Sequence, residues 1–166
     1  GPDDPVTTSR ITSLYRGVQT DAPPRSGAEN PAPSTEMIRR WDLPIARDFP
    51  HRYSEGADIW NPIHTEREVA LRAGLPNIIV HGSALWALAW KHLERAHGPL
   101  ARLAGRFSAM VIPGLPATLA CSGPDPASGR IAFRLENHMG EAAISEGYAE
   151  FLSPAHSAGA RRDPWN

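Results

Sequence analysis

Apolar and polar side chains alternate through much of the second half of the chain, which is the period of a half-buried β-strand. Ile131, Phe133 and Leu135 would share one face of such a strand, with Arg134 on the other. Segments rich in glycine, proline, serine and asparagine separate the alternating runs, as turns do. The predicted strands cover residues 107–112, 115–121, 131–135 and 142–151.

A helical pattern precedes these strands. Residues 84–90 are apolar on every side for two turns, so a helix over 83–97 would have to be surrounded by protein. The last turns of this helix are polar, and Gly98-Pro99 ends it. One buried helix followed by four antiparallel strands predicts the α+β class, with a sheet wrapped around a long central helix.

Between residues 36 and 80 the pattern is helical but interrupted. Asp48 as N-cap and Pro50 in the first turn predict a short helix over 49–56. Thr65-Glu66-Arg67-Glu68 has the form of a capping box and predicts a second helix, which Gly74 would end. This region therefore leads into the buried helix through short helical pieces.

Proline sets the first part of the chain apart. The sequence has 17 prolines, eight of them in residues 1–50, where the lost N–H and fixed φ disfavour regular structure. Only one strand is predicted there, over 8–19, and a proline-rich linker follows it. We expect an N-terminal strand and linker at 1–35, one domain at 36–155 and a C-terminal tail at 156–166.

Length and charge exclude several classes of protein. A chain of 166 residues suits one domain, and a net charge of -1 provides no basic field for nucleic acid. No run approaches the roughly 20 apolar residues of a membrane span. A single cysteine, Cys121, cannot form an internal disulfide, which favours a reducing compartment. We expect a cytoplasmic protein that binds neither nucleic acid nor membranes.

Two short segments carry a recognisable motif. Asn61-Pro62-Ile63-His64 precedes the second predicted helix, and Ile78-Ile79-Val80-His81-Gly82 leads into the buried one. Over residues 47–151 the chain resembles the MaoC-like acyl dehydratases, also called (R)-specific enoyl-CoA hydratases or hydratase 2 proteins. The resemblance implies a single hotdog fold, in which an antiparallel sheet wraps a long central helix. It also implies a homodimer with active sites at its interface.

The chemistry of such enzymes assigns roles to both motifs. Adding water to an enoyl thioester requires a base for the water, an acid for Cα and hydrogen-bond donors for the thioester oxygen. A histidine that titrates near neutral pH can move the proton either way, so His64 is the candidate acid/base. Free N–H groups at a helix start stabilise an enolate-like oxygen, so Gly82 and Ser83 are the candidate oxyanion hole.

The acidic partner of His64 departs from the family's pattern. Members of the family carry a catalytic aspartate five residues before the histidine, whereas Asp58 lies six before His64 and Ile59 occupies the expected position. Either a one-residue bulge brings Asp58 beside His64, or the acidic partner is missing. The second alternative favours a specialised reaction that uses His64 alone.

Other residues near the motifs are candidates for binding the substrate, and each has a structural alternative. A polar residue there could brace its loop or the loop–helix junction, and an aromatic residue could pack in the core. The candidate substrate-binding residues are Asn61, Tyr53, Trp60, His81 and Trp86.

Metal and cofactor motifs are absent from the sequence. Seven histidines occur, but none has the spacing of a zinc site, and no phosphate-binding loop is present, so no metal or cofactor is expected. Arg102, Arg106 and Arg130 could contact the phosphates of a carrier, or could line a solvated sheet edge.

We predict a lyase that removes water reversibly from a 3-hydroxyacyl thioester or hydrates the 2-enoyl form. The substrate would be carried by CoA or by an acyl-carrier protein. Three alternatives stay open at this point. They are a dehydratase-like cyclase or tailoring enzyme of polyketide or natural-product biosynthesis, a hotdog thioesterase, and a non-catalytic hotdog subunit.

Overall fold

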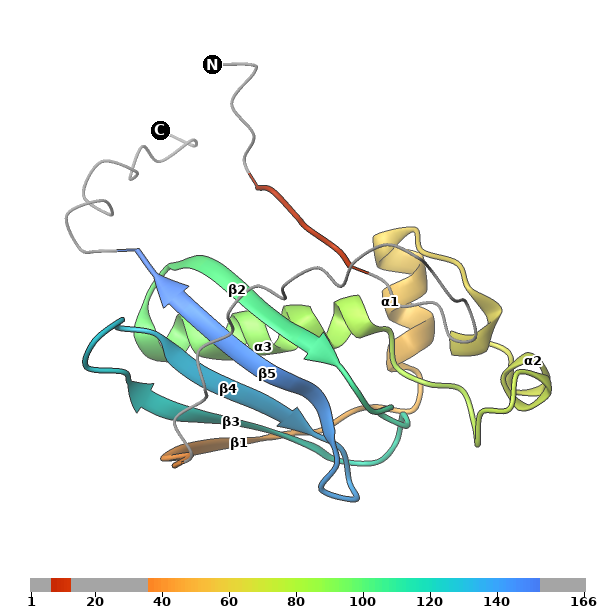
Figure 1. The fold of residues 1–166 in the computed structure, drawn as a ribbon. Coiled ribbons are helices and arrows are strands. Elements are labelled where there is room, and N and C mark those ends of the chain that lie inside the picture. Colours follow the sequence, from red (N-terminus) through yellow and green to blue (C-terminus); the bar gives the residue numbers. More distant parts are fainter. Residues whose placement is uncertain (1–6, 13–35, 153–166) are drawn as a thin grey trace, which may run out of the picture.

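A computed structural model describes residues 7–12 and 36–152 of the chain (Figure 1). The strands are β1 (Arg39–Leu43), β2 (Leu100–Phe107), β3 (Ala117–Pro124), β4 (Ile131–Glu136) and β5 (Ala142–Phe151). The helices are α1 (Phe49–Ala57), α2 (Arg67–Arg72) and α3 (Gly82–His97), with a 3₁₀ turn, η1 (Pro62–His64), between the first two.

The five strands form one sheet in the order β1-β3-β4-β5-β2, and all four pairings are antiparallel. Figure 1 shows α3 running along one face of this sheet, with α1 and α2 beyond the end at which α3 begins. The α+β class and the long helix packed on one antiparallel sheet are therefore confirmed.

The side of α3 that faces the sheet is the centre of the core. Ala84, Leu85, Ala89 and Leu93 are buried and pack with apolar side chains from β3, β4 and β5. The remaining members of the two apolar turns are half-buried, except Ala87, which is exposed. The prediction that these turns are covered on every side is thus wrong within a single chain, because one line along the helix is open.

A bend in β5 shapes the sheet. Glu146 adopts φ 53°, a left-handed conformation, and the ladder with β2 shifts register between Ala104 and Arg106 opposite it. A side chain at the next residue, Gly147, would collide with the carbonyl oxygen and ring of Phe133. The absence of a side chain at Gly147 therefore lets β5 approach β4 closely at the bend.

Several predicted elements are displaced or missing. The predicted strand over 107–112 is wrong in position, because β2 ends at Phe107. The strand β1 was not predicted, since only Leu43 in it is buried and its edge position leaves the other side chains partly or fully exposed. The capping box is also wrong: Glu66 is the N-cap of α2, and no side chain caps that end.

The predicted N-terminal strand is only partly covered by the structure. Residues 7–12 have no regular structure, so the strand is wrong there. The rest of that strand, the proline-rich linker and the C-terminal tail lie outside the described residues, and the domain boundaries remain a prediction.

The contrast between two glycines tests the packing at the bend. Gly147→Ala should lower the free energy of unfolding by about 2 kcal/mol, because the new methyl group forces the strands apart. Gly56→Ala in α1 is the control, since a Cβ there meets nothing within 4 Å, and should raise stability by about 0.5–1 kcal/mol. Urea unfolding measures both, and equal effects of the two substitutions would contradict the close approach of β5 to β4.

Candidate active site

The backbone of Ile79 joins the two sequence motifs. Its N–H donates to the carbonyl oxygen of Ile63 at 3.4 Å, and its carbonyl oxygen accepts from the Nδ1 atom of His64 at 2.8 Å. The next N–H, of Val80, donates to the carbonyl oxygen of Val111 at 2.9 Å. The segment before α3 is thereby held between η1 and the chain that follows β2.

These contacts fix the orientation and tautomer of His64. A carbonyl oxygen can only accept, so the Nδ1 atom of His64 carries the proton and Nε2 keeps its lone pair in the neutral ring. In the part of the chain that the structure describes, no group is hydrogen-bonded to this Nε2 atom. The half-buried ring can thus accept a proton at one defined atom.

A second histidine stacks on the first. The rings of His64 and His81 have centroids 3.7 Å apart and an interplanar angle of 23°. His81 is only 2% exposed, and its Nε2 atom lies 3.1 Å from the hydroxyl oxygen of the fully buried Ser54 on α1. Its Nδ1 atom makes no well-formed hydrogen bond with any described residue. The Tyr53 ring also lies close to His81, with a centroid distance of 5.0 Å.

Burial favours the neutral form of His81. It lowers the pKa of this histidine, and the proximity of His64 lowers it further, while a weaker interaction with the Ile59 backbone acts in the opposite direction. His81 is therefore neutral at neutral pH, and its ring can approach that of His64 without repulsion when His64 takes up a proton.

The N-terminus of α3 lies beside the two stacked histidines. His81 is the N-cap residue of α3, and no side chain caps this end. The N–H groups of Gly82 and Ser83 have no partner among the described residues, and the positive end of the helix dipole adds to their attraction for a negatively charged oxygen. The predicted oxyanion hole therefore begins at the residue next to the stacked histidine.

Phe107 covers the side of Gly82, a contact that the sequence did not suggest. A Cβ on Gly82 would lie 3.0–3.2 Å from three atoms of the Phe107 ring. This ring, 56% exposed at the end of β2, also meets Trp86 edge-on at 5.8 Å. In the sequence, a glycine such as Gly82 and an aromatic residue at the end of a strand are too common to predict this contact.

No hydrogen bond or ion pair joins Asp58 to His64 in this structure. Asp58 ends α1 in the left-handed conformation (φ 51°, ψ 40°), and its N–H donates to the carbonyl oxygen of Ser54. Its side chain is exposed, and no hydrogen bond or ion pair joins its carboxylate to another described residue. The alternative in which Asp58 partners His64 therefore has no hydrogen bond or ion pair to support it and stays a prediction.

The other predicted substrate-binding residues are divided between loop, surface and core. The Oδ1 atom of Asn61 accepts from the N–H of Ile63 at 3.4 Å, which braces η1. Trp60 is 66% exposed, and Trp86 is half-buried with its ring edge-on to Phe133 at 6.2 Å. Of the five, His81 is the one that stacks on His64, and Tyr53 lies against His81.

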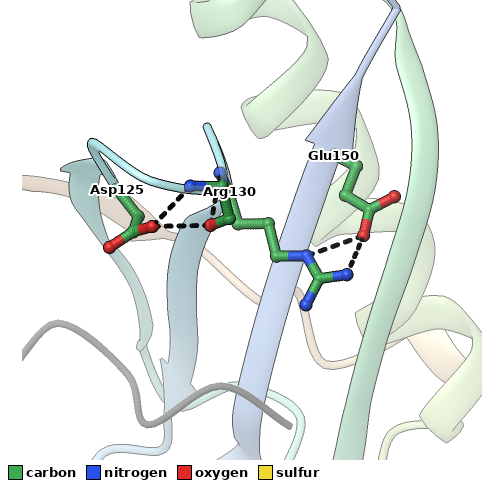
Figure 2. Close-up of polar contacts among 4 residues, drawn as sticks. Asp125, Arg130 and Glu150 are labelled. Carbon is green, nitrogen blue, oxygen red and sulfur yellow. Dashed lines mark hydrogen bonds and ion pairs between the residues drawn. The ribbon is translucent and has the colours of Figure 1, made fainter. Parts of the chain in front are cut away.

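Arg130 is neutralised within the fold. Figure 2 shows its guanidinium reaching from the turn before β4 to Glu150 on β5, with nitrogen–oxygen distances of 2.7 and 2.8 Å. In the same turn the Asp125 carboxylate accepts hydrogen bonds from Ser128, which lower the pKa of this carboxyl group. Arg130 and Arg102 both lie over the ring of Tyr148. The pairing with Glu150 indicates that Arg130 stabilises the sheet rather than binding a phosphate group.

Two cavities of about 350 Å³ each lie on the surface of the chain. The first lies among loop and hairpin residues that include Met110 and Met139, and the second lies against α1 beside Tyr53. Neither is lined by His64.

Within the described ranges no three or more metal-binding side chains come together, and none of the helices has the length and apolar character of a membrane span.

Solved structures share this architecture. The MaoC-like dehydratase from Phytophthora capsici matches with a TM-score of 0.67 and 20% identity, over 86% of this chain and 48% of that one. The full-length peroxisomal multifunctional enzyme type 2 from Drosophila melanogaster has a TM-score of 0.66 and 24% identity, over 74% of this chain and 23% of that one. The chain thus spans less than half of either protein.

A smaller protein is matched over nearly its whole length. The (R)-hydratase from A. caviae involved in PHA biosynthesis has a TM-score of 0.58 and 20% identity, over 71% of this chain and 96% of that one. At these identities the solved structures establish the hotdog fold.

No curated protein matches the chain. A family model described as "MaoC like domain" matches residues 30–125, more than half of the sequence. The chain therefore belongs to the MaoC-like dehydratase domain family.

Proposed function

We propose that this protein catalyses the reversible hydration of a 2-enoyl thioester, with His64 as the acid/base. The observation that carries the proposal is the orientation of His64, whose Nδ1 atom is bound by Ile79 while Nε2 keeps a free lone pair. Membership of the MaoC-like dehydratase family and the nearby open start of α3 support it.

In the hydration direction, the Nε2 atom of His64 removes a proton from water as the water oxygen bonds to Cβ of the enoyl group. The electron pair of the double bond moves toward the thioester, and negative charge develops on its oxygen. The Gly82 and Ser83 N–H groups stabilise that oxygen. His64 then returns the proton to Cα, and dehydration follows the same steps in reverse.

This scheme needs no carboxylate beside His64. The hydrogen bond from Nδ1 to the Ile79 carbonyl orients the ring, which is one of the tasks that a carboxylate performs in a histidine–aspartate pair. Asp58, exposed at the end of α1, is a partner only if the turn rearranges when the substrate binds. The dyad of Asp58 and His64 therefore remains an open part of the proposal.

The substrate in this proposal is an acyl group on CoA or on an acyl-carrier protein, and the protein acts as a homodimer. Two features support the dimer. Among the described strands, β2 is an edge strand whose one partner is β5, and α3 exposes an apolar residue, Ala87, beside half-buried neighbours. A second copy of the chain on this side would cover both.

A specialised dehydratase-like cyclisation is the second candidate. It is favoured by one observation, that no carboxylate among the described residues is hydrogen-bonded or ion-paired to His64. A thioesterase or a non-catalytic subunit would also fit the fold, and the assay described next separates these alternatives by its product.

Replacing the proposed acid/base should abolish most of the activity. His64→Ala should lower kcat for crotonyl-CoA by roughly 100- to 10,000-fold, the usual contribution of general acid–base catalysis. Loss of the enoyl absorbance measures the rate, and His138→Ala, on an exposed hairpin, serves as the matched control. Release of free thiol by the wild type would point to a thioesterase, and no turnover of crotonyl-CoA at all would contradict the proposed function.

Replacing Asp58 separates the single-histidine scheme from the dyad. Asp58→Asn keeps the shape of the side chain and should change kcat by less than about threefold, because no general-base partner is lost in the structure as it stands. The same absorbance assay measures this variant beside Glu55→Gln, an exposed carboxylate one turn earlier. If Asp58→Asn loses as much activity as His64→Ala, the aspartate must reach His64 during the reaction.

A further inference from the structure

His81 and Ser54 form a polar pair in a place where apolar side chains would be expected. His81 is 2% exposed and Ser54 is fully buried, yet the hydrogen bond between them satisfies only one nitrogen of the imidazole ring. The Nδ1 atom of His81 is left without a well-formed partner in the described structure. The Ile59 backbone interacts with the ring only weakly. Because burying a polar atom without a well-formed hydrogen bond costs stability, packing alone does not explain why this ring is a histidine.

The position of His81 relates it directly to His64. The two rings are stacked with centroids 3.7 Å apart. Two consecutive residues of α1 hold the ring of His81: Ser54 through its hydroxyl group and Tyr53 through its ring. Since His81 is also the N-cap of α3, its ring is anchored to two helices, whereas His64 lies in a three-residue turn.

We propose that His81 is a positioning residue for His64, and that its ring, held by Ser54 and Tyr53, is the surface that keeps the Nε2 atom of His64 directed at the substrate. This inference rests on the proposed function. No described carboxylate is hydrogen-bonded to His64, and its ring is held by the Ile79 carbonyl at one edge and by the stacked ring of His81 on its face.

The stack also couples the charges of the two rings. Two imidazolium rings at this distance would repel each other, so a charge on one ring disfavours a charge on the other. Burial and the charge of His64 both lower the pKa of His81, and the titratable rings of Tyr53 and His64 lie against it. The buried His81 ring is therefore a poor competitor for a proton.

The pH dependence follows from the direction of this shift. A histidine whose pKa lies below 6.5 is neutral at neutral pH and becomes charged only as the pH falls past its lowered value. Protonation of His81 would then place a charge against the ring of His64 and oppose proton uptake there. Activity should therefore decline on the acid side as His81 becomes protonated.

A purely structural role for His81 makes different predictions. If the residue only ties the start of α3 to α1, its loss should lower stability and leave kcat and the pH profile of the folded protein unchanged. If it acts by positioning His64, a neutral aromatic ring in its place should preserve activity, and a small side chain should not.

Three variants test the proposal on the full chain. His81→Ala removes the stack and should lower kcat for crotonyl-CoA on the order of 100-fold with little change in KM, the effect expected from a misplaced catalytic group. The double variant Ser54→Ala with His81→Phe keeps a ring and leaves no unpaired hydroxyl group. It should stay within a few-fold of the wild type and keep its activity to lower pH. His92→Phe, at another histidine of α3 whose pKa burial lowers, is the control and should behave as the wild type.

The proposal is overturned if folded His81→Ala keeps wild-type kcat, or if the double variant is as inactive as His81→Ala. NMR titration provides a test that needs no activity. In His64→Phe the titration midpoint of His81 should rise, because the charge of His64 is one cause of its lowered pKa. An unchanged midpoint would contradict the coupling. If the wild type does not hydrate crotonyl-CoA but the midpoint rises, the proposed function fails while the coupled pair stands.

Discussion

The peptide of Ile79 connects parts of the chain that are distant in sequence. Its N–H binds the turn η1 and its carbonyl oxygen binds the side chain of His64, so a single residue determines both where the turn lies and which nitrogen of the histidine is free. The next peptide continues the connection to Val111. The orientation of His64 therefore depends on backbone hydrogen bonds, which need no particular side chain at residue 79.

Close packing supports the site from the side of α3 and the sheet, but not from the side of η1 and α2. The helix α3 is packed on the sheet through Ala89 and Leu93, and the bend at Gly147 lets the strands close beneath it. The short elements η1 and α2 lie beyond the sheet and bury few side chains. His81, anchored to both α1 and α3, links the packed part to the turn that carries His64, which is how a buried histidine can position the proposed acid/base.

Much of this was accessible from the sequence. The helical pattern, with Pro50 near the start of α1 and Gly98 after the end of α3, predicted the bounds of both helices to within a residue or two. These signals depend only on residues close together in the sequence. The edge strand β1 was missed, since Arg39–Leu43 lacks the alternation of a buried strand. The motif identified His64, but its stack on His81 and the Ser54 contact depend on packing between helices. The conformation of Asp58, likewise, is decided by how α1 ends.

The central claim is that the imidazole of His64 has its hydrogen on Nδ1 and a free lone pair on Nε2. Nitrogen-15 NMR of the wild-type protein at neutral to mildly alkaline pH measures this directly, with His64→Ala identifying the resonances. The account predicts that Nδ1 of His64 carries the hydrogen, as its bond to the Ile79 carbonyl requires, and that Nε2 is unprotonated. A ring with its hydrogen on Nε2 would contradict the account, because that atom could not accept a proton from water.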